Sequence, residues 1–268
     1  NVDGVPAATG NVTGTCTSGP VLCLAGNRFR AQVTWKAGNL GGAAQAVSLS
    51  GDTGYFYFLD PANVELMVKV LDGRPLNGSF WVFFGALSNL EYTLTVTDTA
   101  TGAVKTYHNP SGQFASVGDT TAFPAPGGRA ASLQATAGEL SDIGDLGATT
   151  AAATACAAGP TALCLSASRF RVELAWNDGR GHSGAGQAVP LSGDTGYFWF
   201  TSANNVEVIV KVLDARPVNN RFWVFFGALS NLEYTLTVTD TQTGFVKKYH
   251  NPNGTFGSQG DTSAIPGP

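Results

Sequence analysis

Charged side chains are scarce in this chain of 268 residues: Asp, Glu, Lys and Arg make up 13% of it, and the formal net charge is −4. Neither half has an excess of one sign. Nucleic-acid binding requires a basic face that displaces counterions, so we expect no nucleic-acid partner. The apolar runs, such as FWVFFGAL, are far shorter than the roughly 20 residues that cross a bilayer, so we expect no membrane span.

Residues that favour helices are also few. There is one Met, and Lys and Glu are sparse, whereas Gly, Thr, Val and Phe are abundant; this composition favours β-structure. The first residues contain no charged stretch followed by an apolar one, as a signal peptide would. We therefore expect either a cytosolic chain or a chain whose numbering begins after signal removal.

The four cysteines decide between these two compartments. They lie in two similar stretches, CTSGPVLC and CAAGPTALC, and the Gly-Pro in each supplies a turn. Four cysteines allow three pairings, and the duplication favours the local disulfides Cys16–Cys23 and Cys156–Cys164. A zinc site is a poor alternative because no His or third Cys lies nearby and the spacing is too long. Disulfides imply an oxidising compartment, so we expect a secreted or cell-surface protein.

One long internal repeat organises the chain. The string FWVFFGALSNLEYTLTVTD occurs at 80–98 and again at 222–240, and most of the flanking positions also match. Each copy is long enough to bury a core of its own. We predict an N-terminal extension (1–15), repeat 1 (16–123), a linker or extension (124–155) and repeat 2 (156–268).

Within each repeat, apolar and polar residues alternate with a period of two, as in FRAQVTW at 29–35. Turn signals separate roughly seven to nine short strands per repeat, and no amphipathic helix is evident. Gly85 and Gly227 are expected to mark bends between adjacent core strands. The fold predicted is all-β, with two tandem antiparallel β-sandwiches of immunoglobulin-like architecture.

A family resemblance is carried by the repeated string and by several further segments of repeat 2, among them GQAVPLSGDTGYFWF, NVEVIVKVLD and YHNP. They resemble a β-rich module that is often repeated in tandem in large secreted bacterial proteins. The resemblance covers nearly all of both repeats, although repeat 1 has Ser48 for Pro190 and Tyr57 for Trp199. It implies a bacterial, extracellular and modular protein, and it implies no particular activity.

The sequence does not place a nucleophile, a base and an orienting acid in one catalytic set. His108 and His250 precede an Asn-Pro turn signal, and His182 lies in the one variable loop. Three pairs of aspartates lie in turn signals at matching positions of the two repeats: Asp52 and Asp194, Asp72 and Asp214, and Asp119 and Asp261. Aspartates in turns usually bond to their own backbone, and a calcium site is the alternative. We predict no enzyme and no cofactor, with calcium left open.

Charged residues within the strands are expected to face solvent. These residues are Glu65 with Lys69, Glu207 with Lys211, and the arginines Arg28, Arg30, Arg169 and Arg171. Aromatic residues offer an alternative to a purely structural role, since Tyr57, Trp81, Trp199 and Trp223 would suit a platform on which sugars stack. Burial of these rings in a core is the interpretation that we favour.

The function predicted is structural. We expect a non-catalytic secreted subunit that self-assembles into an extracellular filament or surface array, because a segment before a cysteine pair can add a strand to the sheet edge of a neighbour. The expected partners are other copies of the chain, and the candidate assembly residues are Val2, Val5, Val12, Leu140, Ile143 and Leu146. An extracellular adhesion module that binds a glycan or a cell surface is the alternative.

Overall fold

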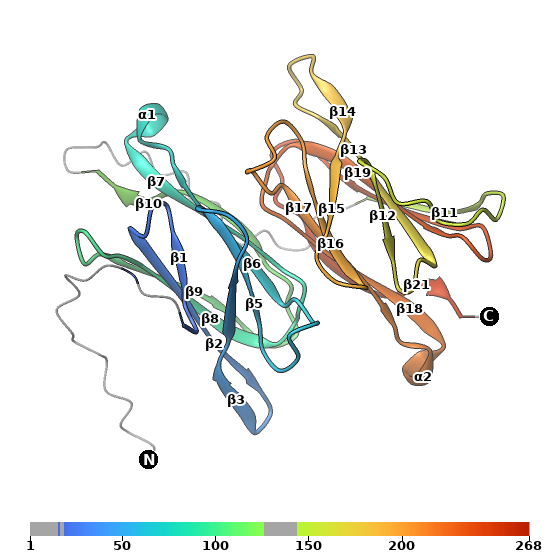
Figure 1. Ribbon diagram of the computed structural model, residues 1–268, viewed down its shortest axis with the longest axis horizontal. Coiled ribbons are helices and arrows are strands. Elements are labelled where there is room, and N and C mark those ends of the chain that lie inside the picture. Colours follow the sequence, from blue (N-terminus) through green and yellow to red (C-terminus); the bar gives the residue numbers. More distant parts are fainter. Residues whose placement is uncertain (1–15, 17–18, 126–143, 268) are drawn as a thin grey trace.

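The computed structural model describes residues 16, 19–125 and 144–267. Strands dominate these residues, and the two helices have only four residues each. The strands form four sheets, two from each repeat (Figure 1). The prediction of an all-β chain is confirmed. In the described part of the chain, no helix is long and apolar enough to cross a membrane.

Repeat 1 forms two sheets of five strands. The first has the order β1-β2-β8-β9, with β3 paired to β2; its strands are β1 (Leu22–Leu24), β2 (Phe29–Ala37), β3 (Leu40–Ala43), β8 (Glu91–Asp98) and β9 (Val104–Asn109). The second has the order β10-β7-β6-β5-β4; its strands are β4 (Gln45–Ser48), β5 (Thr53–Tyr57), β6 (Leu66–Asp72), β7 (Ser79–Ala86) and β10 (Ser116–Pro124). Helix α1 (Arg74–Asn77) connects β6 to β7.

Repeat 2 follows the same plan, and one further strand, β11, is added to it by the segment that precedes it. Its first sheet has the order β11-β20-β19-β13-β12, with β14 on β13; the strands are β11 (Gly144–Thr150), β12 (Ala162–Leu165), β13 (Phe170–Asn177), β14 (Ser183–Ala185), β19 (Glu233–Asp240) and β20 (Phe245–Asn251). Its second sheet has the order β15-β16-β17-β18-β21; the strands are β15 (Gln187–Pro190), β16 (Thr195–Trp199), β17 (Val208–Asp214), β18 (Arg221–Ala228) and β21 (Ser258–Pro266). Helix α2 (Arg216–Asn219) connects β17 to β18.

The two sheets of each repeat enclose one hydrophobic cluster. The period of two decides which side chains enter it: in β2 the burial alternates from Phe29 to Trp35 as the sequence predicts. The ring of Trp35 stacks on Phe58 with 5.5 Å between centroids, and Trp176 stacks on Phe200 at the same distance. Such ring pairs contribute about 0.5–1.5 kcal/mol each beyond the burial of their apolar area.

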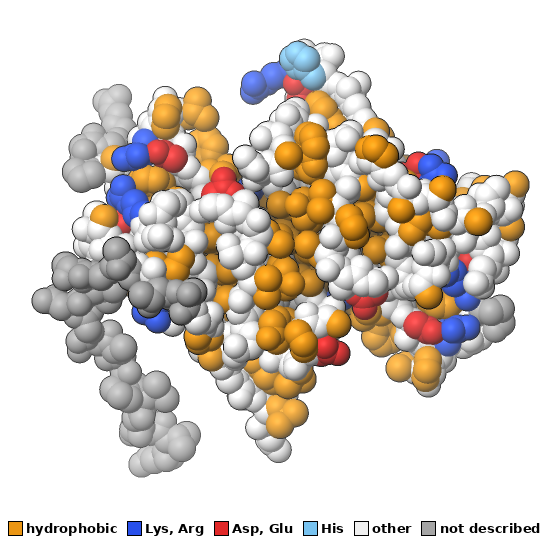
Figure 2. Space-filling model, viewed as in Figure 1, with side chains coloured by type: hydrophobic (Ala, Val, Ile, Leu, Met, Phe, Trp, Pro, Cys, Tyr) orange, Lys and Arg blue, Asp and Glu red, His pale blue; other side chains and the backbone are white. Residues whose placement is uncertain are grey.

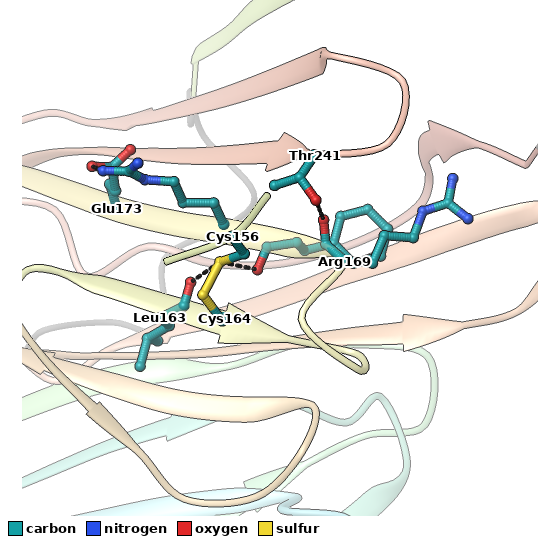
Figure 3. Close-up of a disulfide and its surroundings, with 8 residues drawn as sticks. Cys156, Leu163, Cys164, Arg169, Glu173 and Thr241 are labelled. Atoms are coloured by element: carbon teal, nitrogen blue, oxygen red, sulfur yellow. Dashed lines mark hydrogen bonds and ion pairs between the residues drawn. A yellow bond between two sulfur atoms is a disulfide. The ribbon is translucent and has the colours of Figure 1, made fainter. Parts of the chain in front are cut away.

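Both expected disulfides are present, Cys16–Cys23 and Cys156–Cys164. Figure 3 shows the second one lying against β12 and β13, with Cys156 Sγ 3.7 Å from the carbonyl oxygen of Leu163. Each bond ties the segment before a repeat to the first strand of that repeat. Two disulfides indicate a non-reducing environment for the folded chain.

Replacing both Cys156 and Cys164 by Ala is expected to lower the free energy of unfolding by about 2–3 kcal/mol, because a short closed loop restricts the unfolded chain. Urea denaturation followed by tryptophan fluorescence measures this loss. The same double substitution at Cys16 and Cys23 is the matched control, since that loop has nearly the same length. An unchanged midpoint would show that the bond contributes nothing to stability.

Candidate functional site

The second sheets of the two repeats pack against each other (Figure 1). The hydrophobic cluster between them takes equivalent residues from both repeats: Val64, Met67, Phe83 and Leu87, and Val206, Ile209, Phe225 and Leu229. The ring contacts are also equivalent, with 5.9 Å between the centroids of Phe83 and Phe256 and 5.6 Å between those of Phe114 and Phe225. The repeats are thus related by approximate two-fold symmetry, as the subunits of an isologous dimer are. Figure 1 accordingly shows α1 and α2 at opposite ends.

Gly85 and Gly227 lie at the centre of this repeat junction. The predicted bends do not fall at these residues, because each glycine is paired within a strand, as the next-to-last residue of β7 or β18. A Cβ added to Gly85 would lie 3.0 Å from the carbonyl carbon of Gly227. Both positions are glycine because two central strands approach each other through their backbones.

The strand lysines and glutamates expected in solvent lie inside the repeat junction, and that prediction is wrong. The exposed fractions are 1% for Lys69, 2% for Lys211, 7% for Glu65 and 5% for Glu207. The sequence correctly places each pair on the face that points away from the core of its own repeat. That face is buried because the other repeat covers it, which one repeat's sequence pattern does not reveal.

Each buried lysine bonds to the opposite repeat. Lys69 Nζ donates to Asn205 Oδ1 at 2.6 Å and to the carbonyl oxygen of Val206 at 2.7 Å. The reciprocal bonds join Lys211 Nζ to Asn63 Oδ1 (2.6 Å) and to the carbonyl oxygen of Val64 (2.9 Å). Because buried charges are tolerated only when paired, these bonds fix how the two repeats are placed.

Burial also controls the titration of this network. Burial lowers the pKa of Lys69 to about 8, against the opposing negative charges of Glu207 and Asp52. The pKa of Lys211 is lowered by burial too. Burial raises the pKa of both Glu65 and Glu207, which the lysine of the opposite repeat partly offsets. Desolvation therefore outweighs the attraction within each pair.

The aromatic residues of the glycan-binding alternative lie at or near this junction. Trp81 and Trp223 are half-buried against the junction cluster, and their indole N–H groups donate to Asn77 at 2.8 Å and to Asn219 at 3.0 Å. Tyr57 and Trp199 are half-buried in β5 and β16. Figure 2 shows apolar side chains gathered along the line where the repeats meet. Much of the aromatic face is thus used to join the repeats.

The predicted turn aspartates bond to hydroxyls, to backbone groups and, at Asp72 and Asp214, to the guanidinium groups of Arg74 and Arg216. Asp52 Oδ1 accepts from Ser50 Oγ at 2.7 Å and from Thr53 Oγ1 at 3.0 Å, and Asp119 accepts from Tyr107 Oη at 2.9 Å. His108 Nδ1 lies 3.3 Å from Thr93 Oγ1. Among the described residues, no group of three or more His, Cys, Asp or Glu side chains is placed to hold a metal ion.

The prediction that all four strand arginines face solvent is wrong for Arg169, which is 8% exposed. Its guanidinium forms two hydrogen bonds with the buried carboxylate of Asp240, at 3.0 and 2.7 Å, and lies 4.2 Å from the ring centroid of Phe222. Arg28 holds Asp98 in the same way in repeat 1. These arginines anchor the turn that follows β8 or β19, and their charge is used within the fold.

An edge of the first sheet distinguishes the two repeats. In repeat 2, β11 covers the outer edge of β20. In repeat 1, β9 is the last strand of its sheet in the part of the chain that is described. Val104 of β9 is 56% exposed, whereas its counterpart Val246 in β20 is 7% exposed. An uncovered edge presents unpaired N–H and C=O groups to a further strand.

The candidate assembly residues lie around this edge only in part. Leu146 lies in β11 and is 58% exposed. The others, Val2, Val5, Val12, Leu140 and Ile143, lie outside the described residues. β11 pairs with its own repeat, so the segment before repeat 2 serves as an edge strand within the chain.

Sequence reasoning missed Asn63 and Asn205, which accept from the buried lysines. One available signal is the identical Asn-Val-Glu triplet that precedes β6 and β17 in both copies. Another is a lysine flanked by valines in the middle of a strand, where solvation is unusual.

Comparisons with family models, curated proteins and solved structures gave no match.

Proposed function

We propose that the chain is a non-catalytic structural protein that assembles outside the cell by adding a strand of one copy to a sheet edge of the next. The observation that carries this proposal is the pairing of β11 with β20. It supports a mode of association in which the segment before a repeat extends a sandwich sheet. The same acceptor edge in repeat 1, β9, is uncovered by any described strand.

The composition and the disulfides support an extracellular, polymeric role. Charged residues make up only 13% of the chain, so little electrostatic repulsion opposes contact between copies. Disulfides persist in oxidising compartments. A contact between the N-terminal segment of one copy and β9 of the next is heterologous, and repeated contacts of this kind build an open filament if they do not close into a ring.

The finer description of the fold belongs to the same proposal. We take residues 16–123 and 156–268 as two tandem domains of immunoglobulin-like architecture, supported by a separate core cluster in each repeat. The buried junction makes the pair one building block. The similarity to modules of large secreted bacterial proteins fits a part that is used repeatedly.

The glycan- or surface-binding alternative has weaker support. A sugar platform needs aromatic rings that lie open to solvent on one face. Trp81 and Trp223 instead pack partly against the junction cluster. We therefore favour assembly over glycan recognition, and glycan arrays with the dispersed protein are the direct test of the alternative.

Deletion of residues 1–15 is expected to abolish assembly, because it removes the strand that would be donated. Negative-stain electron microscopy and light scattering of the full chain and the truncated chain measure this effect. Val104→Glu, on the acceptor edge, is expected to weaken assembly as well. Leu59→Glu is the matched control, because Leu59 is a similarly exposed apolar residue (68%) that lies outside β9. Dispersed monomers from the full chain would contradict the proposed function.

A further inference from the structure

Among the described strands, none covers the edge of β9, whereas β11 covers the edge of its counterpart β20. β11 pairs with β20 in an antiparallel register that places Ala148 opposite Lys247 and Thr149 opposite Val246. Val246, which Thr149 of β11 faces, is 7% exposed, whereas its counterpart Val104 is 56% exposed. In the described part of the chain, repeat 1 therefore presents an exposed apolar side chain and an unpaired edge where repeat 2 has a paired strand.

The turn beside this edge points to the same missing strand. A Cβ on Gly244 would lie 2.0 Å from the carbonyl oxygen of Ala151, the residue that follows β11, and Ala151 N donates to the Gly244 carbonyl oxygen at 2.6 Å. Gly102 is the counterpart of Gly244, and their φ angles are 75° and 74°. No atom of the described residues lies within 4 Å of a Cβ placed on Gly102. The turn in repeat 1 thus has the same glycine conformation, and no described residue lies where the main chain of a further strand lies in repeat 2.

The segment before Cys16 resembles the segment that forms β11. Three residues occur at the same distances before Cys16 and Cys156: Gly4 and Gly144, Ala8 and Ala148, and Thr9 and Thr149. Both cysteines are bonded to the first strand of their repeat, β1 or β12. The two segments therefore start from equivalent points on equivalent sandwiches.

The mismatches between the segments are informative. Pro6 corresponds to Leu146, which lies at the irregularity between Asp145 and Ala148 in the β11 pairing. A proline is tolerated at a bulge because no ladder hydrogen bond is required there. Ala7 corresponds to Gly147, whose φ is 79°, a conformation that disfavours alanine. If this segment paired in the register of β11, the strain at Ala7 would make it bind less firmly than β11 and exchange more easily between copies.

We propose that residues 4–10 occupy the edge of β9 as an antiparallel strand, in the register of β11 on β20. Val5 then lies opposite Tyr107, Ala8 opposite Lys105 and Thr9 opposite Val104, which covers the exposed valine. That the strand comes from a neighbouring copy rests on the proposed function. The acceptor edge and the register are independent of it, because a strand from the same copy would occupy the same edge in the same register.

A cysteine cross-link tests this register in the full chain. The variant Ala8→Cys/Lys105→Cys is oxidised mildly and analysed by non-reducing gel electrophoresis and peptide mass spectrometry. Ala8→Cys/Thr106→Cys is the matched control, since adjacent strand residues point to opposite faces. Ala148→Cys/Lys247→Cys is the positive reference, because these two residues are paired in the structure.

We expect the Lys105 variant to cross-link to the same extent as the reference and the Thr106 variant to cross-link much less. Products with the mobility of dimers and longer ladders support both the register and the proposed function. A cross-link confined to the monomer supports the register and overturns donation between copies. Equal, low cross-linking of the Lys105 and Thr106 variants, beside a reactive reference, overturns the register even if electron microscopy shows filaments.

Discussion

Replacing Lys69 by Met is expected to lower the free energy of unfolding by about 3–5 kcal/mol. The side chain is buried, and its ammonium group supplies hydrogen bonds to Asn205 and to the carbonyl of Val206 across the repeat junction. Met fills a similar volume but donates nothing. It leaves two buried acceptors unsatisfied and the carboxylate of Glu207 without its positive neighbour, and each of these losses is costly in a buried site.

Urea denaturation at pH 7 measures this change. Lys36→Met is the matched control, because Lys36 is exposed in β2, and we expect its effect to stay within about 0.5 kcal/mol. The double variant Lys69→Met/Glu207→Gln is expected to regain part of the loss, since it removes the unpaired buried charge together with its partner. A Lys69→Met chain as stable as the wild type would show that the network does not hold the repeats together.

The same lysine gives the stability a pH dependence of known sign. The pKa of Lys69 falls from 10.5 to about 8 on folding because of burial, so between these values the unfolded chain binds more protons. The free energy of unfolding therefore rises with pH from about 8 toward 10, by up to about 1.4 kcal/mol per pH unit. The contribution is fully present above the unfolded pKa and is lost as the pH falls through about 8.

Lys69→Met is expected to reduce the rise in the free energy of unfolding with pH, and the part of the rise that Lys211 contributes is expected to remain. Above pH 10 the slope reverses, because burial raises the pKa of Tyr92 and Tyr234 and only the unfolded tyrosines ionise there. Unfolding curves collected at intervals between about pH 7 and about pH 11 measure both effects. The same slope in the wild type and in Lys69→Met would contradict the assignment.

Introducing Val at Gly85 is expected to cost about 2–4 kcal/mol and to loosen the repeat junction. Even a Cβ at this position lies 3.0 Å from the Gly227 backbone, and backbone atoms cannot move aside as a flexible side chain does. The two sheets must separate to admit the valine. That separation weakens the lysine bonds and the ring contacts between Phe83 and Phe256.

Small-angle scattering and limited proteolysis, together with urea denaturation, report on this separation. Gly42→Val is the matched control, since Gly42 lies in β3 and nothing lies within 4 Å of a Cβ there. We expect the control to behave like the wild type. A Gly85→Val chain with unchanged dimensions and stability would mean that the close approach of the two glycines is not required for stability or for the packing of the repeats.

The sequence by itself determined the local structure of this protein. Period-two alternation specified the strands and their inward faces, as in β2, because successive side chains in a strand point to opposite sides. The Asp98 to Gly102 segment specified the turn between β8 and β9, where Gly102 adopts a positive φ. The duplicated cysteine pairs specified local disulfides, because residues so close in the chain and joined by a turn meet readily.

Only the tertiary structure decided what covers the second face of each sheet. Alternation places Lys69 on the side away from the core of its own repeat, and it does not say whether solvent or another sheet lies beyond. The partner surface is more than a hundred residues away in the chain, as the Lys69–Asn205 bond shows. Burial of the lysines and the role of Gly85 both follow from that packing. They depend on contacts between repeats, which no pattern within one repeat encodes.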